Sequence, residues 1–287
     1  MLRLIAWSLA LGLPAFGAQA GLLVDCPQPI EPETRASLRV ASLNVAHGRD
    51  QNWNQLFVTK KRIGHNLQDI ARLLNEQGVD VAALQEADGP SRWSGRIDHV
   101  RRIAEHSALS YSVHGLHAVS RMSQYGTALL ANQALSSALS HRFEPSPPTK
   151  TKGFVQAVVT IGEGERQTEV TVVSVHMDFS RESVRTSQAR EMITRLSSLS
   201  TPLIVAGDFN ATWDDDTSAV RMLAEGLELS AFQPADPGMG TYKSIEGERL
   251  DWILISPQLQ FLDYRVLNVE VSDHLPVVAD IGLRQVD

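Results

Sequence analysis

The sequence contains one cysteine, Cys26, in 287 residues, so no disulfide can form within the chain. It also lacks internal repeats, low-complexity tracts and a linker in its middle. These absences exclude a small disulfide-stabilised scaffold and a repeat architecture. Hydrophobic residues make up 43% of the chain, which is enough to build a sizeable core. The stability of the fold must therefore come from that core.

An excess of positive charge is also missing, since the formal net charge is −7 at pH 7. An acidic protein has no long-range attraction for a polyanion, because net charge sets that attraction. A bound divalent cation would reverse the charge locally. The net charge therefore neither supports nor excludes a substrate that carries phosphate.

Residues 1–20 have the pattern of a secretory signal peptide. Arg3 supplies a positive start, residues 4–16 are apolar apart from the break at Pro14, and Ala18-Gln19-Ala20 is a cleavage pattern of small residues. The apolar stretch is too short to span a membrane, and a buried N-terminal helix is the alternative. We predict that residues 1–20 are removed and that the protein is secreted or periplasmic.

Residues 21–36 are rich in proline, and we expect an extended leader before a domain over residues 37–283. Apolar residues at 3.6-residue spacing predict a helix over 59–77, with Gly78 as its C-terminal cap. Further helices are predicted over 97–106 and 183–199. Alternating or continuous apolar runs predict strands over 38–45, 79–85, 126–131, 154–161, 169–175, 202–206, 250–255, 261–271 and 275–281. Segments 213–216 and 233–242 are predicted to be loops.

The stretch from Pro202 to Asn210 is the most informative part of the chain. Residues 203–206 read as a strand buried on both faces, and Asp208 and Asn210 follow Gly207 directly. Two residues apart in an extended backbone, their side chains point to the same side. A carboxylate and a carboxamide at the end of a buried strand are costly unless they are needed there. An Asx-turn after the strand is the structural alternative.

Polar residues of the same kinds lie at the ends of other apolar strands along the chain, either closing a strand or standing at its start. These residues are Asn44, Glu86, His176, Asp251, Asp273 and His274. Strand ends are where sites are assembled in layered α/β folds. Each residue alone has a structural explanation, but together they predict one polar site at the ends of several strands.

Seven segments carry a resemblance to a known family. They are SLNV (42–45), LQE (84–86), QYGTAL (124–129), VHMD (175–178), GDFN (207–210), LDWIL (250–254) and SDHLPV (272–277). In this order and spacing they resemble the motifs of the endonuclease/exonuclease/phosphatase superfamily, over about residues 37–283. The resemblance implies an α/β fold of the DNase I-like type: a four-layered sandwich with two packed mixed β-sheets flanked by helices, and the site at one rim.

The resemblance also implies roles for the site residues. Glu86 is expected to bind the metal with Asn44 and Asp273, because Mg²⁺ prefers hard oxygen ligands. Asn44 would supply a neutral oxygen or hold a water of the metal, and it is also a candidate substrate-binding residue. Mn²⁺ or Ca²⁺ could replace Mg²⁺. Asp208 would orient or deprotonate the attacking water, and Asn210 would donate its amide to a phosphate oxygen.

Two histidines are implied to carry protons or contact the phosphate. Asp251 would fix the tautomer of His274, as in a catalytic triad. The resemblance leaves open whether His176 or His274 is the acid, and Asp178 is a partner for His176 only by proximity. Tyr125 is expected to contact the phosphate, and a core aromatic is an equal alternative.

Several charged residues outside the motifs have weaker interpretations. Arg185 and Gln188 most simply form a solvated helix face, although an interior brace recurs in relatives. Lys150 and Lys152 could approach the substrate, but exposed lysines are the commoner case. The acidic segment 214–216 could bind Ca²⁺, and a solvated loop is the simpler explanation.

These residues predict an exported, metal-dependent phosphoesterase, most simply a phosphodiesterase or nuclease. The partner would be a phosphodiester in a nucleic acid or a phospholipid head group, and we expect a monomer with no stable protein partner. A nuclease needs an arranged basic surface, for which the candidates are Arg92, Arg96, Arg101, Arg102 and Arg121. A sphingomyelinase-like enzyme needs an exposed aromatic hairpin, for which the candidates are Trp53, Trp93 and Trp213. The pattern also leaves room for a sugar or inositol-phosphate phosphatase and for an inactive binding module.

Overall fold

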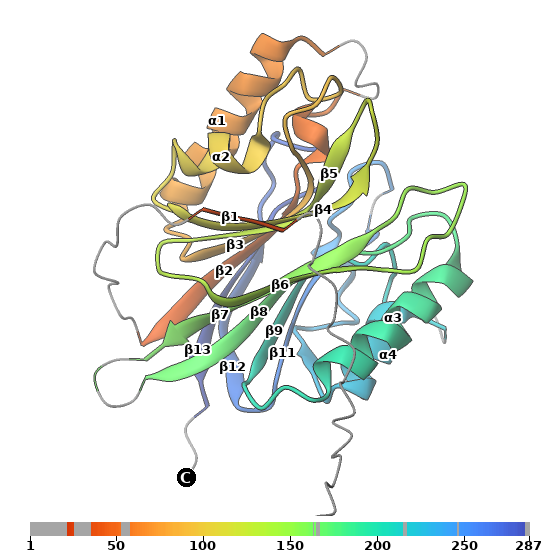
Figure 1. The fold of residues 1–287 in the computed structure, drawn as a ribbon. Helices are drawn as coiled ribbons and strands as arrows, with labels where there is room; N and C mark the ends of the chain where they lie inside the picture. The colour runs from red at the N-terminus through yellow and green to blue at the C-terminus, as the bar shows by residue number, and fades with distance from the viewer. Residues whose placement is uncertain are drawn as a thin grey trace, which may run out of the picture.

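Two β-sheets pack face to face, and a pair of helices covers the outer face of each (Figure 1). The computed structural model describes residues 22–25, 36–52, 58–162, 164, 167–214, 217–245 and 247–284. The layers run helix, sheet, sheet, helix, which confirms the predicted four-layered α/β sandwich with two packed mixed sheets. The signal peptide and most of the leader lie outside the described residues and stay predictions.

The first sheet has seven described strands in the order β1-β4-β5-β3-β2-β13-β12. Strands β2 and β3 are parallel and form its centre, and the remaining pairs are antiparallel. Helices α1 (Lys60–Glu76) and α2 (His99–Ala104) cover its outer face. The strands are β1 (Leu22–Asp25), β2 (Ser37–Asn44), β3 (Val81–Asp88), β4 (Tyr111–Val119), β5 (Gln124–Ala131), β12 (Leu259–Val266) and β13 (Val277–Leu283).

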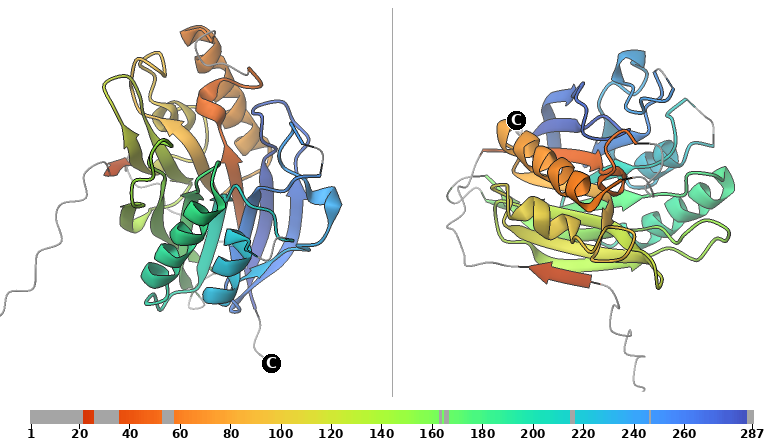
Figure 2. Two further views of the ribbon diagram at one scale, coloured as in Figure 1. Left: turned by 90° about the vertical axis from the view of Figure 1, so that its right-hand side faces the viewer. Right: turned by 90° about the horizontal axis from the view of Figure 1, so that it is seen from above.

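The second sheet has six described strands in the order β10-β11-β9-β8-β7-β6. Strands β8 and β9 are its parallel pair. Helices α3 (Glu182–Leu196) and α4 (Ala219–Gly226) lie side by side on its outer face (Figure 2, left). The strands are β6 (Ser136–Arg142), β7 (Gly153–Ile161), β8 (Thr168–His176), β9 (Leu203–Asp208), β10 (Ser230–Ala231) and β11 (Asp251–Ile255).

Three apolar clusters hold these layers together. One lies between the sheets and includes Val155, Ala206 and Ile253. The second joins the first sheet to α1 and α2, and the third joins the second sheet to α3 and α4. The central strands are therefore buried on both faces, which explains why residues 203–206 are apolar without alternation.

The predicted helix over residues 59–77 is confirmed in detail. The hydroxyl of Thr59 accepts a hydrogen bond from the backbone N–H of Arg62, which caps the N-terminus of α1. Gly78 follows the helix with a φ of 61°, a left-handed conformation that glycine adopts without strain. No helix among the described residues is long and apolar enough to cross a membrane.

Some elements lie outside the sequence-based expectations. Strands β4, β6 and β10 and helix α4 were not predicted. Strand β4 carries His114, Gly115 and His117 within its run, β6 is largely polar and has no buried residue, and β10 has only two residues. The strand predicted over 261–271 ends at Val266. Within the expected leader, residues 22–25 pair with β4 as the edge strand β1.

The register of three adjacent strands brings the polar strand ends together. His176 at the end of β8 pairs with Asp208 at the end of β9, and Asp208 pairs with Asp251 at the start of β11. A close backbone approach at Gly207 allows this alignment, since a Cβ there would lie 2.1 Å from the carbonyl oxygen of Val175.

We predict that Gly207→Ala lowers the free energy of unfolding by about 1–3 kcal/mol, because the added methyl group must displace the β8 backbone. Gly64→Ala in the middle of α1 is the matched control. A Cβ there would meet only Ile97 Cδ1, at 3.9 Å, so this change should raise the free energy of unfolding by about 0.5–1 kcal/mol. Urea unfolding measures both, and equal effects would contradict the close packing at Gly207.

Candidate active site

Asp208 lies at the centre of the polar cluster, and its side chain is almost completely buried. Its carboxylate accepts hydrogen bonds from the side-chain amide of Asn44 (2.9 Å) and the backbone N–H of Asn210 (2.9 Å). The Nε2 atoms of His176 and His274 lie 3.5 Å and 3.9 Å from Asp208 Oδ2. Burial raises the pKa of Asp208 to about 6, against the influence of His274. The site thus holds a carboxylate that can take up a proton near neutral pH.

His274 forms the predicted pair with Asp251. Its Nδ1 lies 2.7 Å from Asp251 Oδ2, which also accepts a hydrogen bond from the hydroxyl of Thr241 at 2.7 Å. Burial alone would lower the pKa of His274, but Asp251 and then Asp208 outweigh it and raise the pKa to about 10. His274 is therefore an imidazolium at neutral pH, with Nε2 directed towards Asp208.

His176 has a different environment from His274. The ammonium group of Lys152 lies 2.9 Å from its Nε2 and 3.2 Å from its Nδ1. Burial, and then the charge of Lys152, hold the pKa of His176 well below its usual value. The imidazole is therefore neutral.

The surroundings of His176 overturn two expectations. Lys152 is buried, so the exposed alternative is wrong for this residue, although Lys150 is exposed. Asp178 accepts hydrogen bonds from the backbone N–H groups of Ser180 and Arg181, and its carboxylate holds that turn rather than orienting His176.

Glu86 lies within β3 at a bulge, not beyond the strand end. The pairing of β3 with β5 shifts register between Gln85 and Ala87, and Glu86 has a φ of 53°. Bulges of this kind redirect a side chain, and such strained backbone conformations cluster at functional sites. Here the bulge turns a carboxylate into the cluster from the middle of a buried strand.

Cationic side chains surround the Glu86 carboxylate. His47 Nε2 lies 3.3 Å, Arg49 Nη1 3.6 Å and Lys152 Nζ 3.9 Å from its oxygens. Burial raises the pKa of Glu86, but these charges outweigh burial and hold the pKa well below its ordinary value. Glu86 is thus fully ionised, as a metal ligand must be.

Asp273 lies on the other side of the same guanidinium. Arg49 Nη2 is 2.5 Å from Asp273 Oδ2, so Arg49 connects the two expected metal-binding carboxylates. The space between the Glu86 and Asp273 carboxylates is therefore already occupied by a positive charge, which shows that the two side chains together favour a cation there. Two carboxylates around such a position offer the hard oxygen donors that a divalent cation such as Mg²⁺ prefers.

A second group of candidate ligands is Asp208, Asp251 and His274, whose ligand atoms lie within 4.8 Å of one another. His274 Nδ1 and Asp251 are already hydrogen-bonded to each other, so Nε2 is the one ring nitrogen of His274 left to bind a metal. Their short mutual bond fits proton transfer better than metal ligation. We therefore favour Glu86 and Asp273 as the pair that could hold a metal.

The remaining predicted site residues, Asn44, Asn210 and Tyr125, each contact a different part of the site. The side-chain oxygen of Asn44 accepts from the backbone N–H of Ala46, so its amide group faces Asp208. Asn210 donates one amide N–H to the carbonyl of Met177, and its side-chain nitrogen carries a second N–H. Tyr125 packs edge-on against His47 at 4.7 Å between ring centroids. Its role as a phosphate contact stays a prediction.

The structure adds residues that the sequence analysis did not assign to the site. His47 lies between Glu86 and Asp88, with Nδ1 2.8 Å from the Asp88 carboxylate. Arg49 follows two residues later in the same segment after β2. The sequence held one indication of both residues, because the segment Asn44–Asp50 contains a histidine and an arginine shortly after a predicted strand end.

The residues surround one pocket with a volume of about 490 Å³. Its lining combines the expected metal side, the two imidazoles, Asp208 and Asn210 with Arg185, Phe179, Tyr242 and Glu248. A smaller polar pocket of about 220 Å³ adjoins it and shares Arg185, Asn210, Glu248 and Leu250. The pocket therefore continues beyond the polar cluster on the side of Asn210.

The tryptophans proposed as membrane-contacting tips are packed against other side chains where the structure describes them. Trp213 packs on Trp252, with ring centroids 5.7 Å apart, and Trp93 packs edge-on against His47, so neither is an exposed hairpin tip. Trp53 lies outside the described residues.

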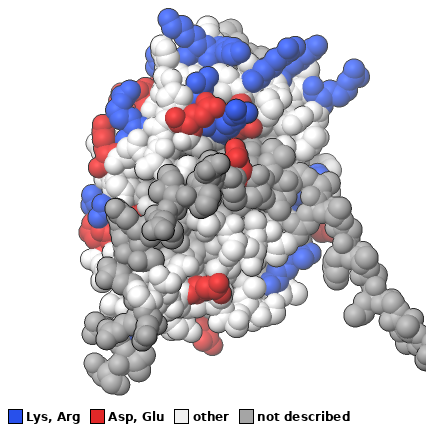
Figure 3. Space-filling model, turned by 60° about the vertical axis from the view of Figure 1, so that its left-hand side comes forward, with Lys and Arg blue, Asp and Glu red and all other residues white. Residues whose placement is uncertain are grey.

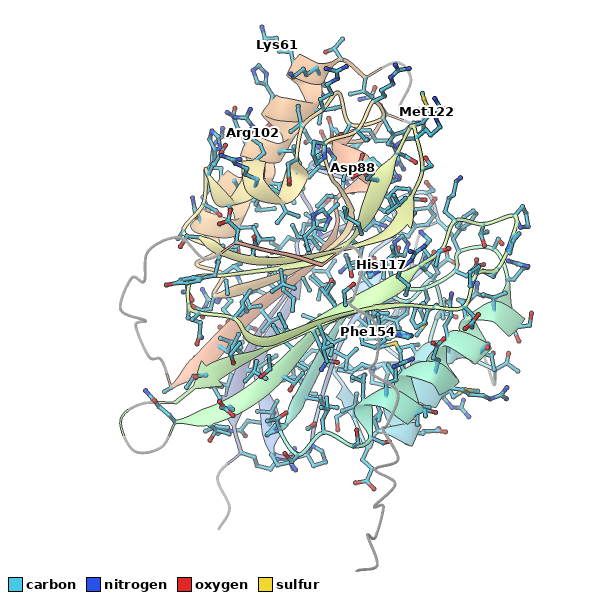
Figure 4. All side chains as sticks on the ribbon, viewed as in Figure 1. Lys61, Asp88, Arg102, His117, Met122 and Phe154 are labelled. Carbon is cyan, nitrogen blue, oxygen red and sulfur yellow. The ribbon has the colours of Figure 1, made fainter. Side chains whose placement is uncertain are left out.

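Lys and Arg gather at the end of the molecule that carries α1, with Asp and Glu among and below them (Figure 3). The tip of the β4–β5 hairpin carries Met122, whose side chain points away from the body (Figure 4).

The profile of the Endonuclease/Exonuclease/phosphatase family matches residues 41–274 of this chain. The chain therefore belongs to the endonuclease/exonuclease/phosphatase family, as its motifs predicted. A search of curated proteins finds no match.

Solved structures share the fold at low sequence identity. An endonuclease/exonuclease/phosphatase from Beutenbergia cavernae matches with a TM-score of 0.66 and 20% identity, over 87% of this chain and 72% of that one. The catalytic domain of human Nocturnin, solved with a sulfate anion, matches at 0.62 and 18%, over 90% and 98%. A mannosyl-6-phosphatase from Bacteroides thetaiotaomicron matches at 0.62 and 15%, over 86% and 100%.

We predict that Asp251→Asn lowers the pKa of His274 by about 1–3 units, because it removes the nearest negative charge. The folded-state pKa is raised, so the pair stabilises the protein fully below about pH 6.5 and loses this contribution as the pH rises through about 10. The stability difference between wild type and variant should therefore shrink at alkaline pH. NMR of labelled imidazoles measures the pKa, and a wild-type value near 6.5 for His274 would contradict the pairing.

Proposed function

We propose that this protein is an exported, divalent-metal-dependent phosphoesterase that hydrolyses phosphodiester bonds by attack of water. The observation that carries the proposal is the surroundings of Asp208. A carboxylate that can accept a proton near neutral pH lies beside an imidazolium, a neutral imidazole and an amide, in one pocket with two further ionised or cation-bound carboxylates. Family membership supports the same reaction class.

Glu86 and Asp273 would hold the metal, with Mg²⁺ expected and Mn²⁺ or Ca²⁺ as substitutes. When bound, the cation would neutralise the charge of the phosphoryl oxygens. Arg49 would remain in contact with these carboxylates or turn to the phosphate. A cation at this position would also favour the ionised form of Asp208.

The division of labour between the histidines follows from their charges. His274, as an imidazolium, would donate from Nε2 to a phosphoryl oxygen, while Asp208 accepts the proton of the attacking water. His176 is neutral and in contact with the ammonium of Lys152. It would pass a proton from Lys152 to the leaving oxygen, while Asn210 donates its second amide N–H to the phosphate.

A diester substrate is supported by the adjoining pocket beyond Asn210. A phosphodiester carries an organic group on each side of the phosphate, and the adjoining pocket offers further room into which one of them would extend. The packed positions of Trp93 and Trp213 lend no support to a membrane-binding hairpin. We therefore propose a soluble phosphodiester substrate, for which the negative net charge is no obstacle once a divalent cation is bound.

We predict that the protein hydrolyses bis(p-nitrophenyl) phosphate with added Mg²⁺ and loses this activity in EDTA. His274→Ala should lower the rate by about 100- to 10,000-fold, the usual contribution of a proton-transferring side chain. Glu86→Gln should shift the Mg²⁺ dependence to higher concentration, because it removes one ligand charge.

The matched control is His65→Ala, which removes an exposed histidine from α1. Its rate should equal that of the wild type. Activity that survives both EDTA and His274→Ala would refute the mechanism.

Export is supported by the charge, apolar run and small residues of segment 1–20. We predict that expression of the full chain in a Gram-negative host yields a mature protein in the periplasm or medium, with an N-terminus at Gly21. N-terminal sequencing of the fractionated protein measures this. Intact Met1 on a protein in the cytoplasmic fraction would rule out the signal peptide.

A further inference from the structure

Phe179 is a large apolar side chain at the mouth of the pocket. It is 64% exposed and lines the pocket together with His176 and Arg185. Tyr242, the other aromatic side chain in the lining, already packs on His274 with ring centroids 5.0 Å apart. Single exposed apolar residues are common on protein surfaces, so exposure alone assigns Phe179 no role.

The backbone around Phe179 is held unusually firmly for an exposed residue. The buried Asp178 carboxylate accepts hydrogen bonds from the N–H groups of Ser180 and Arg181, each at 2.9 Å. Its second oxygen accepts a hydrogen bond from the hydroxyl of Thr149. Both neighbours of Phe179 in the chain are thus fixed by one side chain.

Helix α3 holds the same turn from its other side. Gln188 is buried and accepts a hydrogen bond from the Asp178 backbone N–H at 2.9 Å, and Arg185 donates to the Asp178 carbonyl at 3.1 Å. These bonds correct the expectation that Arg185 and Gln188 form a solvated helix face. They brace the residue that precedes Phe179.

The surroundings of Phe179 do not resemble a membrane-binding surface. Most of the pocket lining is charged or amide-bearing, including Arg49, Glu86, Arg185, Glu248 and Asp273. Insertion into a bilayer interface needs an apolar face, not one ring on a charged rim. A ring with a fixed backbone and only two rotatable bonds does suit stacking, because little entropy is lost when a ligand contacts it.

We propose that Phe179 is a specificity-determining residue of this site, whose ring stacks on a planar group linked to the substrate phosphate through a sugar, as a nucleobase is. Asp178, Gln188 and Arg185 are positioning residues that hold the ring at a fixed distance from the reacting phosphorus. The inference rests on the proposed phosphodiesterase function and adds to it the recognition of one flanking group.

Four soluble substrates test the proposal: the thymidine dinucleotide and its analogues that lack the first thymine, the second thymine or both. All four keep the same phosphodiester and the same leaving oxygen. The wild type should hydrolyse the analogue without the stacked thymine with a kcat/KM about 5- to 150-fold lower, which is the range for stacking of one base on one aromatic side chain. In Phe179→Ala the rates on the four substrates should converge, and Phe179→Trp should restore the preference.

Leu262→Ala is the matched control, because it removes an exposed apolar side chain (57% exposed) from β12, outside the pocket lining. It should keep the wild-type preference. Equal loss of rate by Phe179→Ala on all four substrates would show a merely structural role and overturn the proposal. Equal wild-type rates on all four substrates would overturn it too, and a loss by Phe179→Ala on sphingomyelin vesicles alone would assign the ring to a membrane instead.

Bis(p-nitrophenyl) phosphate separates this inference from the function on which it rests. Hydrolysis of that ester without a base preference overturns the role of Phe179 and leaves the proposed function standing. Absence of hydrolysis of every phosphodiester in the presence of Mg²⁺ overturns both.

Discussion

A buried negative charge at the end of β9 is the constraint on which the rest of the site depends. Isolated in an apolar interior, the Asp208 carboxylate would be strongly unfavourable. It is tolerated because Asn44, the backbone of Asn210 and the charged His274 surround it, and these groups come from both sheets. The positions of β2, β9 and the segment before β13 are therefore fixed relative to one another by the need to satisfy one side chain.

Much of this arrangement could be predicted from the sequence. Apolar runs that stop at Asn44, His176 and Asp208 mark strands whose ends meet at one edge, and parallel neighbours such as β8 and β9 bring those ends together. The pairing of His274 with Asp251 came from the family motifs, since two residues 23 positions apart on different segments have no local signal.

Other parts of the site could not be predicted, for physical reasons. Lys152 carries a charge that is normally exposed, and its burial is tolerable because the Glu86 carboxylate and the neutral His176 imidazole lie beside it, with Asp208 and Asp178 adding negative charge nearby. Glu86 enters the site through a bulge, which depends on pairing with β5 and leaves no mark in the hydrophobic pattern. His47 depends on the left-handed backbone at residues 46 and 47, which the residue types there do not indicate.

The hydrogen bond between Asn44 and Asp208 crosses from one sheet to the other, so the geometry of the site depends on the distance between the two sheets. Such a bond tolerates only a few tenths of an ångström of stretch before it weakens. A larger side chain at Ala206, which lies in the cluster between the sheets, would push the sheets apart two residues from the Asp208 carboxylate. The small side chains between the layers therefore set the spacing of the two halves of the site, and larger side chains in that part of the core would shift Asn44 relative to Asp208 while the protein remained folded.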